Sequence, residues 1–256
     1  MSSESLRDRD RPLLVALVDG RPGVGAGHLG RSLAVVEAWV AGGGRALLAD
    51  DQPLPDEWRE RYAAAGAPIG TGAPDVLLVD GYGFDDRAVG SRRGSAAVVS
   101  IDDRERSGRR AIDLAVDVEP PAGGATTRVT SVRPLRCTGP RYALLRREVV
   151  AAADPSHRPD ATEGPLRLVV AMGGAPTAPV RAALSSAVRE LEATTDLAVT
   201  WLQGRDDVGA VLAASDLALS AAGSTAWELA LHGVPAALVP VADNQVPVAA
   251  AVAAAG

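Results

Sequence analysis

The stretch Gly23-Val24-Gly25-Ala26-Gly27-His28-Leu29-Gly30-Arg31 is a glycine-rich turn between two apolar segments. The segment before it, Leu13 to Val18, is continuously apolar, as expected for a strand buried on both faces of a parallel sheet. The segment after it, Leu29 to Val40, repeats apolar residues at helical spacing and is followed by three glycines that can end a helix. The sequence therefore predicts a strand, a turn and a helix in succession.

The same alternation continues along the chain. Further strands are predicted at residues 45–49, 76–79, 96–101 and 114–118, with helices at 57–65 and 142–152. After a stretch rich in Pro, His, Asp and Gly, strands are predicted at 166–172, 197–202, 217–219 and 236–239. Helices are predicted at 180–192 and 208–214, before residue 232, and from residue 244 onward. Strands that alternate with helices favour an α/β fold with right-handed crossovers.

Two halves repeat this plan, so we predict two Rossmann-like domains facing a cleft, at residues 1–152 and 166–256. Residues 153–165 form the expected linker. No strand pattern follows the last helix, and the second domain is therefore expected to be incomplete at its C-terminal end.

Composition excludes several classes of protein. The net charge is -6 and all 26 basic residues are arginine, so a nucleic-acid-binding face is not expected. Cys137 is the single cysteine, which rules out an internal disulfide and a cysteine metal cluster. The apolar run at 13–18 is too short for a signal peptide or a membrane span. A cytoplasmic protein without a membrane span is expected, and the oligomeric state is left open.

The turn around His28 has two interpretations. Gly25, Gly27 and Gly30 match the G-x-G-x-x-G dinucleotide fingerprint, and Asp50 follows about twenty residues later. In that fingerprint, however, the glycines follow the strand at once, whereas here Asp19 to Val24 intervene. The longer loop favours a turn that projects a side chain toward a ligand.

His28 is the side chain that this turn would present. At the start of a helix the macrodipole disfavours the charged imidazolium, so a neutral ring able to accept a proton is expected. A surface or capping histidine is the simpler alternative, but Gly25 and Gly27 would let a ligand approach the backbone closely. Arg31, one turn along, either meets an anionic group or is a solvated helix charge.

A second turn, Gly223-Ser224-Thr225, also lies between a predicted strand and a predicted helix. Free backbone N–H groups at a helix start form an anion site, and glycine lets a phosphate come near. Glu228, one turn into the helix, could accept hydrogen bonds from ribose hydroxyls. The alternative is a capping box, in which Thr225 and Glu228 only satisfy backbone donors.

Two more segments follow strands of the second half. Gly173-Gly174 is either a ligand-binding turn at the carboxyl end of a strand or a tight loop. Asn244, within Asp243-Asn244-Gln245, either caps the last helix or faces the same cleft. The three histidines do not have metal-ligand spacing with carboxylates, so neither a metal site nor a cofactor is predicted.

Taken in order, these motifs resemble a known family: the UDP-sugar hydrolase of the pseudaminic acid pathway and its relatives in spore-coat polysaccharide synthesis. The resemblance rests on residues 25–32, 80–82, 141–146, 173–174, 223–228 and 243–245, and runs over nearly the whole chain. Those proteins share the two-domain GT-B fold of the peptidoglycan N-acetylglucosaminyltransferase.

The resemblance implies metal-free hydrolysis of a UDP-linked amino-deoxy sugar, by attack of water at the anomeric carbon. It implies that His28 accepts the proton of water and that Tyr82, the tyrosine of the cleft, is the other catalytic residue. It implies that Glu228 and Asn244 bind the nucleotide. With the residue-based assignments, the substrate-binding set is Gly27, Arg31, Gly173, Gly174, Gly223, Ser224, Thr225, Glu228 and Asn244.

Two alternatives stay open. A GT-B glycosyltransferase would use the same donor site with an alcohol or amine as acceptor. A non-catalytic protein that only binds sugar nucleotides is suggested by Gly81, where the family often has histidine, and by Ala175-Pro176 after the glycine pair.

Overall fold

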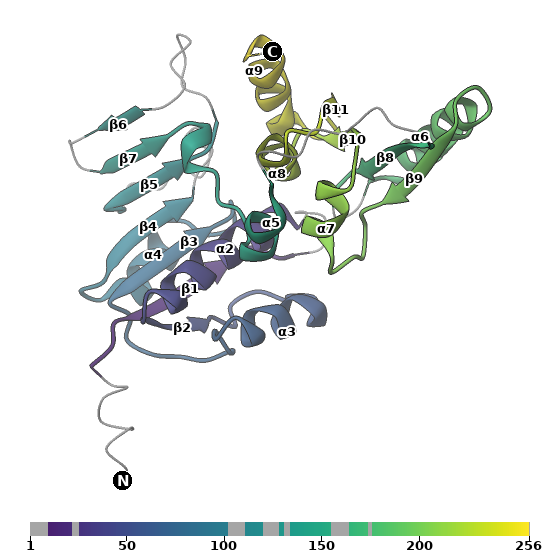
Figure 1. The fold of residues 1–256 in the computed structure, drawn as a ribbon. Coiled ribbons are helices and arrows are strands. Elements are labelled where there is room, and N and C mark those ends of the chain that lie inside the picture. Colours follow the sequence, from purple (N-terminus) through teal and green to yellow (C-terminus); the bar gives the residue numbers. More distant parts are fainter. Residues whose placement is uncertain are drawn as a thin grey trace. The chain divides into compact units, whose positions relative to one another are not determined.

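The computed structural model describes residues 10–21, 26–101, 111–119, 128–130, 134–154, 164–173 and 176–255. The chain divides into two compact units, Met1–Arg146 and Arg147–Gly256. Each unit contains its own β-sheet flanked by helices (Figure 1).

The first unit is built on a mostly parallel sheet. In its described residues seven strands lie in the order β2-β1-β3-β4-β5-β7-β6, and only the β6–β7 pairing there is antiparallel. The strands are β1 (Leu13–Val18), β2 (Arg45–Leu48), β3 (Val76–Asp80), β4 (Ala97–Ile101), β5 (Leu114–Asp117), β6 (Arg128–Thr130) and β7 (Leu135–Thr138). The helices are α2 (Gly27–Ala41), α3 (Asp56–Ala64) and α4 (Asp86–Arg93), with a 3-10 turn at Pro140–Tyr142.

Alternate residues of β1 enter two different hydrophobic layers. Leu14, Ala16 and Val18 pack in the layer that α2 and α3 cover, together with the buried Tyr62. Leu13, Val15 and Leu17 pack in the layer on the opposite face, which includes Val89 of α4. Successive side chains of a strand point to opposite faces, which explains why a strand buried on both sides has no polar alternation.

The second unit has a smaller parallel sheet. In its described residues four strands lie in the order β11-β10-β8-β9. They are β8 (Leu166–Ala171), β9 (Leu197–Trp201), β10 (Leu217–Ala221) and β11 (Ala236–Val239). The helices are α5 (Arg147–Ala152), α6 (Ala178–Glu192), α7 (Val208–Ala213), α8 (Thr225–His232) and α9 (Val246–Ala255), with a 3-10 turn at Asp243–Gln245.

The predicted α/β class with two Rossmann-like sheets is confirmed, but the helix predicted at 142–152 is too long. It begins at Arg147, and Leu144 before it packs on the first unit's core instead. Helix α5 belongs to the second unit, because Val149 is buried there with Val208 and Leu212. The predicted domain boundary at residue 152 therefore differs from the division observed at residue 146. Most of the predicted linker, residues 155–163, lies outside the described residues.

The short helix α4 and strands β6 and β7 were not predicted. Among the described residues, no helix has the length and apolar character needed to cross a membrane.

Candidate functional site

Two buried aspartates mark the carboxyl edge of the first sheet. Asp80 is the last residue of β3, and Asp19 follows the last residue of β1. The strands are paired with Val18 opposite Asp80, and the backbone N–H of Asp19 donates to the carbonyl of Asp80 at 2.9 Å. Both aspartates are fully buried. Ligands bind at this edge in open α/β sheets.

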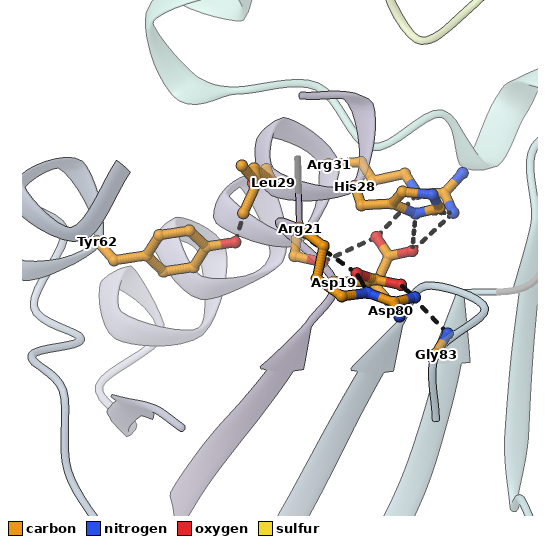
Figure 2. Close-up of polar contacts among 9 residues, drawn as sticks. Asp19, Arg21, His28, Leu29, Arg31, Tyr62, Asp80 and Gly83 are labelled. Atoms are coloured by element: carbon orange, nitrogen blue, oxygen red, sulfur yellow. Dashed lines mark hydrogen bonds and ion pairs between the residues drawn. The ribbon is translucent and has the colours of Figure 1, made fainter. Parts of the chain in front are cut away.

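Three side chains from the first two turns of α2 converge on Asp80, and Figure 2 shows His28 and Arg31 pointing toward it. Arg31 forms a bidentate pair, from Nε to Oδ2 at 2.8 Å and from Nη2 to Oδ1 at 2.6 Å. The Ser32 hydroxyl donates to Oδ2 at 2.8 Å. His28 Nδ1 lies 2.7 Å from Oδ1. Helical spacing places residues 28, 31 and 32 on one face, which explains why one carboxylate can reach all three.

The contacts of Asp80 settle where a neutral His28 carries its proton. An ionised carboxylate only accepts hydrogen bonds, so the proton must lie on Nδ1 and be donated to Asp80 Oδ1. Arg31 Nη2 is 3.0 Å from the same Nδ1, and in this tautomer both nitrogens donate to Asp80 Oδ1 instead of to each other. The lone pair of the neutral ring is therefore on Nε2, which is the arrangement a general base needs.

The electrostatics of this cluster favour an ionised Asp80. Burial by itself would raise the pKa of Asp80, but the Arg31 charge, the His28 ring and their hydrogen bonds outweigh it. They hold the pKa of this carboxyl well below its usual range. Arg31 and Asp80 compensate each other's charge in the interior. Arg31 is thus not a solvated helix charge, and its predicted contact with a substrate anion stays a prediction.

Tyr82 lies beside the imidazole. The two rings meet edge to face, with centroids 5.4 Å apart and planes at 88°. Tyr82 is 39% exposed, whereas His28 is buried. The two residues that the resemblance assigned to catalysis are thus neighbours, although 54 positions separate them in the sequence.

In the second unit, the turn Gly223-Ser224-Thr225 connects β10 to α8. Ser224 is the residue that caps α8, and its side chain makes no capping hydrogen bond. Thr225 is the first residue inside the helix, so Thr225 and Glu228 do not occupy the cap and third positions of a capping box. That alternative is wrong. The N–H groups of Ala226 and Trp227 donate to the carbonyls of Gly223 and Ser224, both at 3.1 Å, and an anion site at this turn stays a prediction.

The Asp243–Gln245 turn comes close to the glycine turn, because β10 and β11 are neighbours. A Cβ on Gly223 would lie 3.8 Å from Gln245 Nε2. Asn244 is exposed in the middle of this turn, and Glu228 is buried in α8.

Gly173 follows β8 with a φ of +74° and lines a cavity of about 230 Å³ with Met172 and Trp201. Gly174 lies outside the described residues.

Sequence reasoning missed three residues of this polar cluster and its surroundings. Asp80 entered only as part of the motif at residues 80–82, Asp19 only as the first residue of the loop before the glycine turn, and Ser32 was given no role. The signal was present, since parallel strands end at one sheet edge and a buried carboxylate there needs partners. Among the described residues, no group of three or more His, Cys, Asp or Glu side chains is arranged to hold a metal ion.

Comparison with solved structures shows the fold of glycosyltransferases. A glycotransferase of kitacinnamycin matches with a TM-score of 0.57 and 17% identity, over 95% of this chain and 84% of that one. MurG of Acinetobacter baumannii has a TM-score of 0.57 and 16% identity, over 95% and 83%. The spinosyn rhamnosyltransferase SpnG, solved with thymidine diphosphate, has a TM-score of 0.56 and 18% identity, over 96% and 85%.

At sequence identities this low, the similarity shows the fold alone, and the fold is GT-B-like. A putative UDP-N-acetylglucosamine 2-epimerase from Listeria monocytogenes also matches, with a TM-score of 0.51, 11% identity and coverage of 92% and 81%. No protein-family model matches the sequence, and no curated protein matches it.

Proposed function

We propose that the protein is a glycosyltransferase that uses a nucleotide-linked sugar as donor, with His28 as the general base. The observation that carries this proposal is the Asp80–His28 pair, which directs the free lone pair of a neutral imidazole to Nε2. The GT-B-like fold supports it, because three of the similar structures are named as glycosyltransferases or as MurG.

The proposed chemistry is a displacement at the anomeric carbon. His28 Nε2 takes the proton of an acceptor hydroxyl while the acceptor oxygen bonds to the anomeric carbon. The bond from that carbon to the phosphate oxygen breaks, and the nucleoside diphosphate leaves with the bonding electrons. A positioned general base typically contributes about 10²–10⁴-fold of rate.

The second unit is proposed to bind the leaving diphosphate. The backbone N–H groups at the start of α8 and the hydroxyls of Ser224 and Thr225 can donate to its oxygens, and charge that develops there is stabilised by the helix N-terminus. Glu228, Asn244 and the glycine pair 173–174 remain proposed nucleotide contacts. The nucleoside is left open between uridine and thymidine, since SpnG was solved with thymidine diphosphate.

Hydrolysis of a UDP-linked amino-deoxy sugar is the second candidate. It is favoured by the combination of residues 25–31, 223–228 and 243–245, which resembles the hydrolases of surface-glycan synthesis. Water then replaces the acceptor hydroxyl, and every other role is unchanged.

The experiment that separates these functions is a panel of UDP-sugars and dTDP-sugars, incubated with purified protein with and without acceptor extracts. Release of nucleoside diphosphate only with an acceptor supports the transferase. Release in water alone supports the hydrolase. Nucleotide binding without release under either condition contradicts both and indicates a protein that only binds sugar nucleotides.

A further inference from the structure

Asp19 is a buried carboxylate that the proposed chemistry does not use. It is fully buried at the end of β1, and Arg21 pairs with it through Nε to Oδ1 and Nη2 to Oδ2, both at 2.8 Å. The Arg21 side chain is 47% exposed, so its charge is partly in solvent. Burial alone would raise the pKa of Asp19, but hydrogen bonds and charge from Arg21 outweigh it and lower that pKa.

The same carboxylate holds the turn that follows β3. The backbone N–H of Gly83 donates to Asp19 Oδ2 at 3.2 Å (Figure 2). Gly81 packs so tightly on Asp19 that a Cβ there would lie 2.1 Å from the Asp19 Cβ, and its φ of +118° favours glycine. At Gly83, a Cβ would lie 2.7 Å from Arg21 Nη2 and 2.9 Å from Asp19 Oδ2.

Tyr82 is the residue between these two glycines. Its backbone is therefore fixed on both sides by contacts with Asp19 and Arg21, while its ring meets His28 edge to face at 5.4 Å. Asp80 positions the imidazole from one side.

We propose that Asp19 is a positioning residue for Tyr82: with Arg21 as its counter-ion, it holds the Gly81–Gly83 turn so that the tyrosine ring contacts His28. This rests on the proposed function only for its effect on turnover. The structural part, that the Tyr82–His28 contact depends on Asp19, holds whatever the reaction is.

The structural part is tested by NMR of the imidazole signals, which need no substrate. The chain has three histidines, so the spectrum is simple, and His28→Asn identifies the His28 signals. Tyr82→Leu defines the shift that loss of the ring produces. Asp19→Asn is expected to move the His28 signals toward their Tyr82→Leu positions, while Asp85→Asn, which removes the cap of α4 on the same loop, leaves them in place.

A second variant allows the proposal to be tested even if Asp19→Asn does not fold. Gly83→Ala keeps the Asp19 charge but places a methyl group against Arg21 and the carboxylate, and the same shift is expected. If the His28 signals stay at their wild-type positions in folded Asp19→Asn or Gly83→Ala protein, the proposal is overturned.

The kinetic part uses a double-mutant cycle. A misplacement of about 1 Å in an active site can cost about 10²-fold in rate, so Asp19→Asn is expected to lower kcat by about 10- to 100-fold with the donor KM unchanged. In a Tyr82→Leu background, Asp19→Asn should lower kcat no further. An undiminished loss in that background would show that Asp19 does not act through Tyr82. Absence of turnover in the wild type would instead contradict the proposed function, and the NMR result would still decide the proposal.

Discussion

Replacing Asp80 with asparagine removes one charge from the centre of the polar cluster while keeping the size of the side chain. The carboxylate receives hydrogen bonds from His28, Arg31 and Ser32, and it is fully buried. Asparagine keeps one carbonyl oxygen but turns the other acceptor into a donor. That donor would face either the Arg31 guanidinium or the Nδ1 proton of His28.

The expected loss of stability follows from Arg31, whose side chain is only 10% exposed. Removing one partner of a buried ion pair typically costs about 3–5 kcal/mol, because the remaining charge is left uncompensated. The effect on turnover has a separate cause. An asparagine no longer holds the proton on Nδ1, and loss of the correct tautomer in a histidine–aspartate pair can lower kcat by about 10⁴-fold.

Urea unfolding followed by tryptophan fluorescence measures the first effect. Trp39 and Trp58 pack in the core of the first unit, so a Trp201→Phe/Trp227→Phe background reports on that unit. Asp50→Asn is the matched control, because the Asp50–Arg59 pair is exposed and such pairs contribute at most about 1 kcal/mol. If Asp80→Asn lowers the free energy of unfolding by less than about 1 kcal/mol, Asp80 does not compensate a buried Arg31 charge.

Three further predictions concern the pH response and the two turns. The pKa of Asp80 is depressed in the folded protein, so the stabilisation by its carboxylate is present above the unfolded pKa of about 4 and is lost as pH falls below it. The free energy of unfolding of the first unit should therefore depend less on acid pH in Asp80→Asn than in the wild type. Burial of His232 lowers its pKa, so as pH falls the unfolded chain binds a proton before the folded chain does. The free energy of unfolding of the second unit, followed by the fluorescence of Trp201 and Trp227, should therefore fall from about pH 7 to 5. His232→Gln should remove this pH dependence. In Gly223→Ala the new methyl group would make an ordinary van der Waals contact with Gln245 Nε2, 3.8 Å away, so thermal stability should be unchanged. The same methyl group would keep a phosphate away from the backbone, so calorimetry should show weaker binding of UDP or dTDP.

The regular parts of the fold were predictable because local patterns and tertiary packing agree there. The continuous apolar run of β1 reflects burial in two layers, and β11 was predicted with its observed bounds. Helix α4 was missed because only Val89 of its eight residues is buried. Its local signals are the cap residue Asp85, whose side chain accepts from the Ala88 N–H at 2.8 Å, and the charges of its first and last turns.

The site was predictable only in part. His28 and Tyr82 were found from motifs, but their shared environment is non-local: Asp80 lies 52 residues from His28. The helix pattern alone could not tell whether Arg31 is solvated or forms a buried ion pair, because the answer depends on which strand end lies opposite it. The predicted helix start at residue 142 was wrong for a similar reason, because Leu144 packs in the core of the first unit and is not part of α5.

The role of His28 is tested by comparing wild-type protein with His28→Ala in two assays: release of nucleoside diphosphate from the donor that the panel identifies, and calorimetric binding of the free nucleoside diphosphate. We expect kcat to fall by about 10²–10⁴-fold while the Kd of the nucleotide is nearly unchanged, because the base and the proposed diphosphate site lie in different units. Turnover at the wild-type rate in His28→Ala would show that His28 is not the general base.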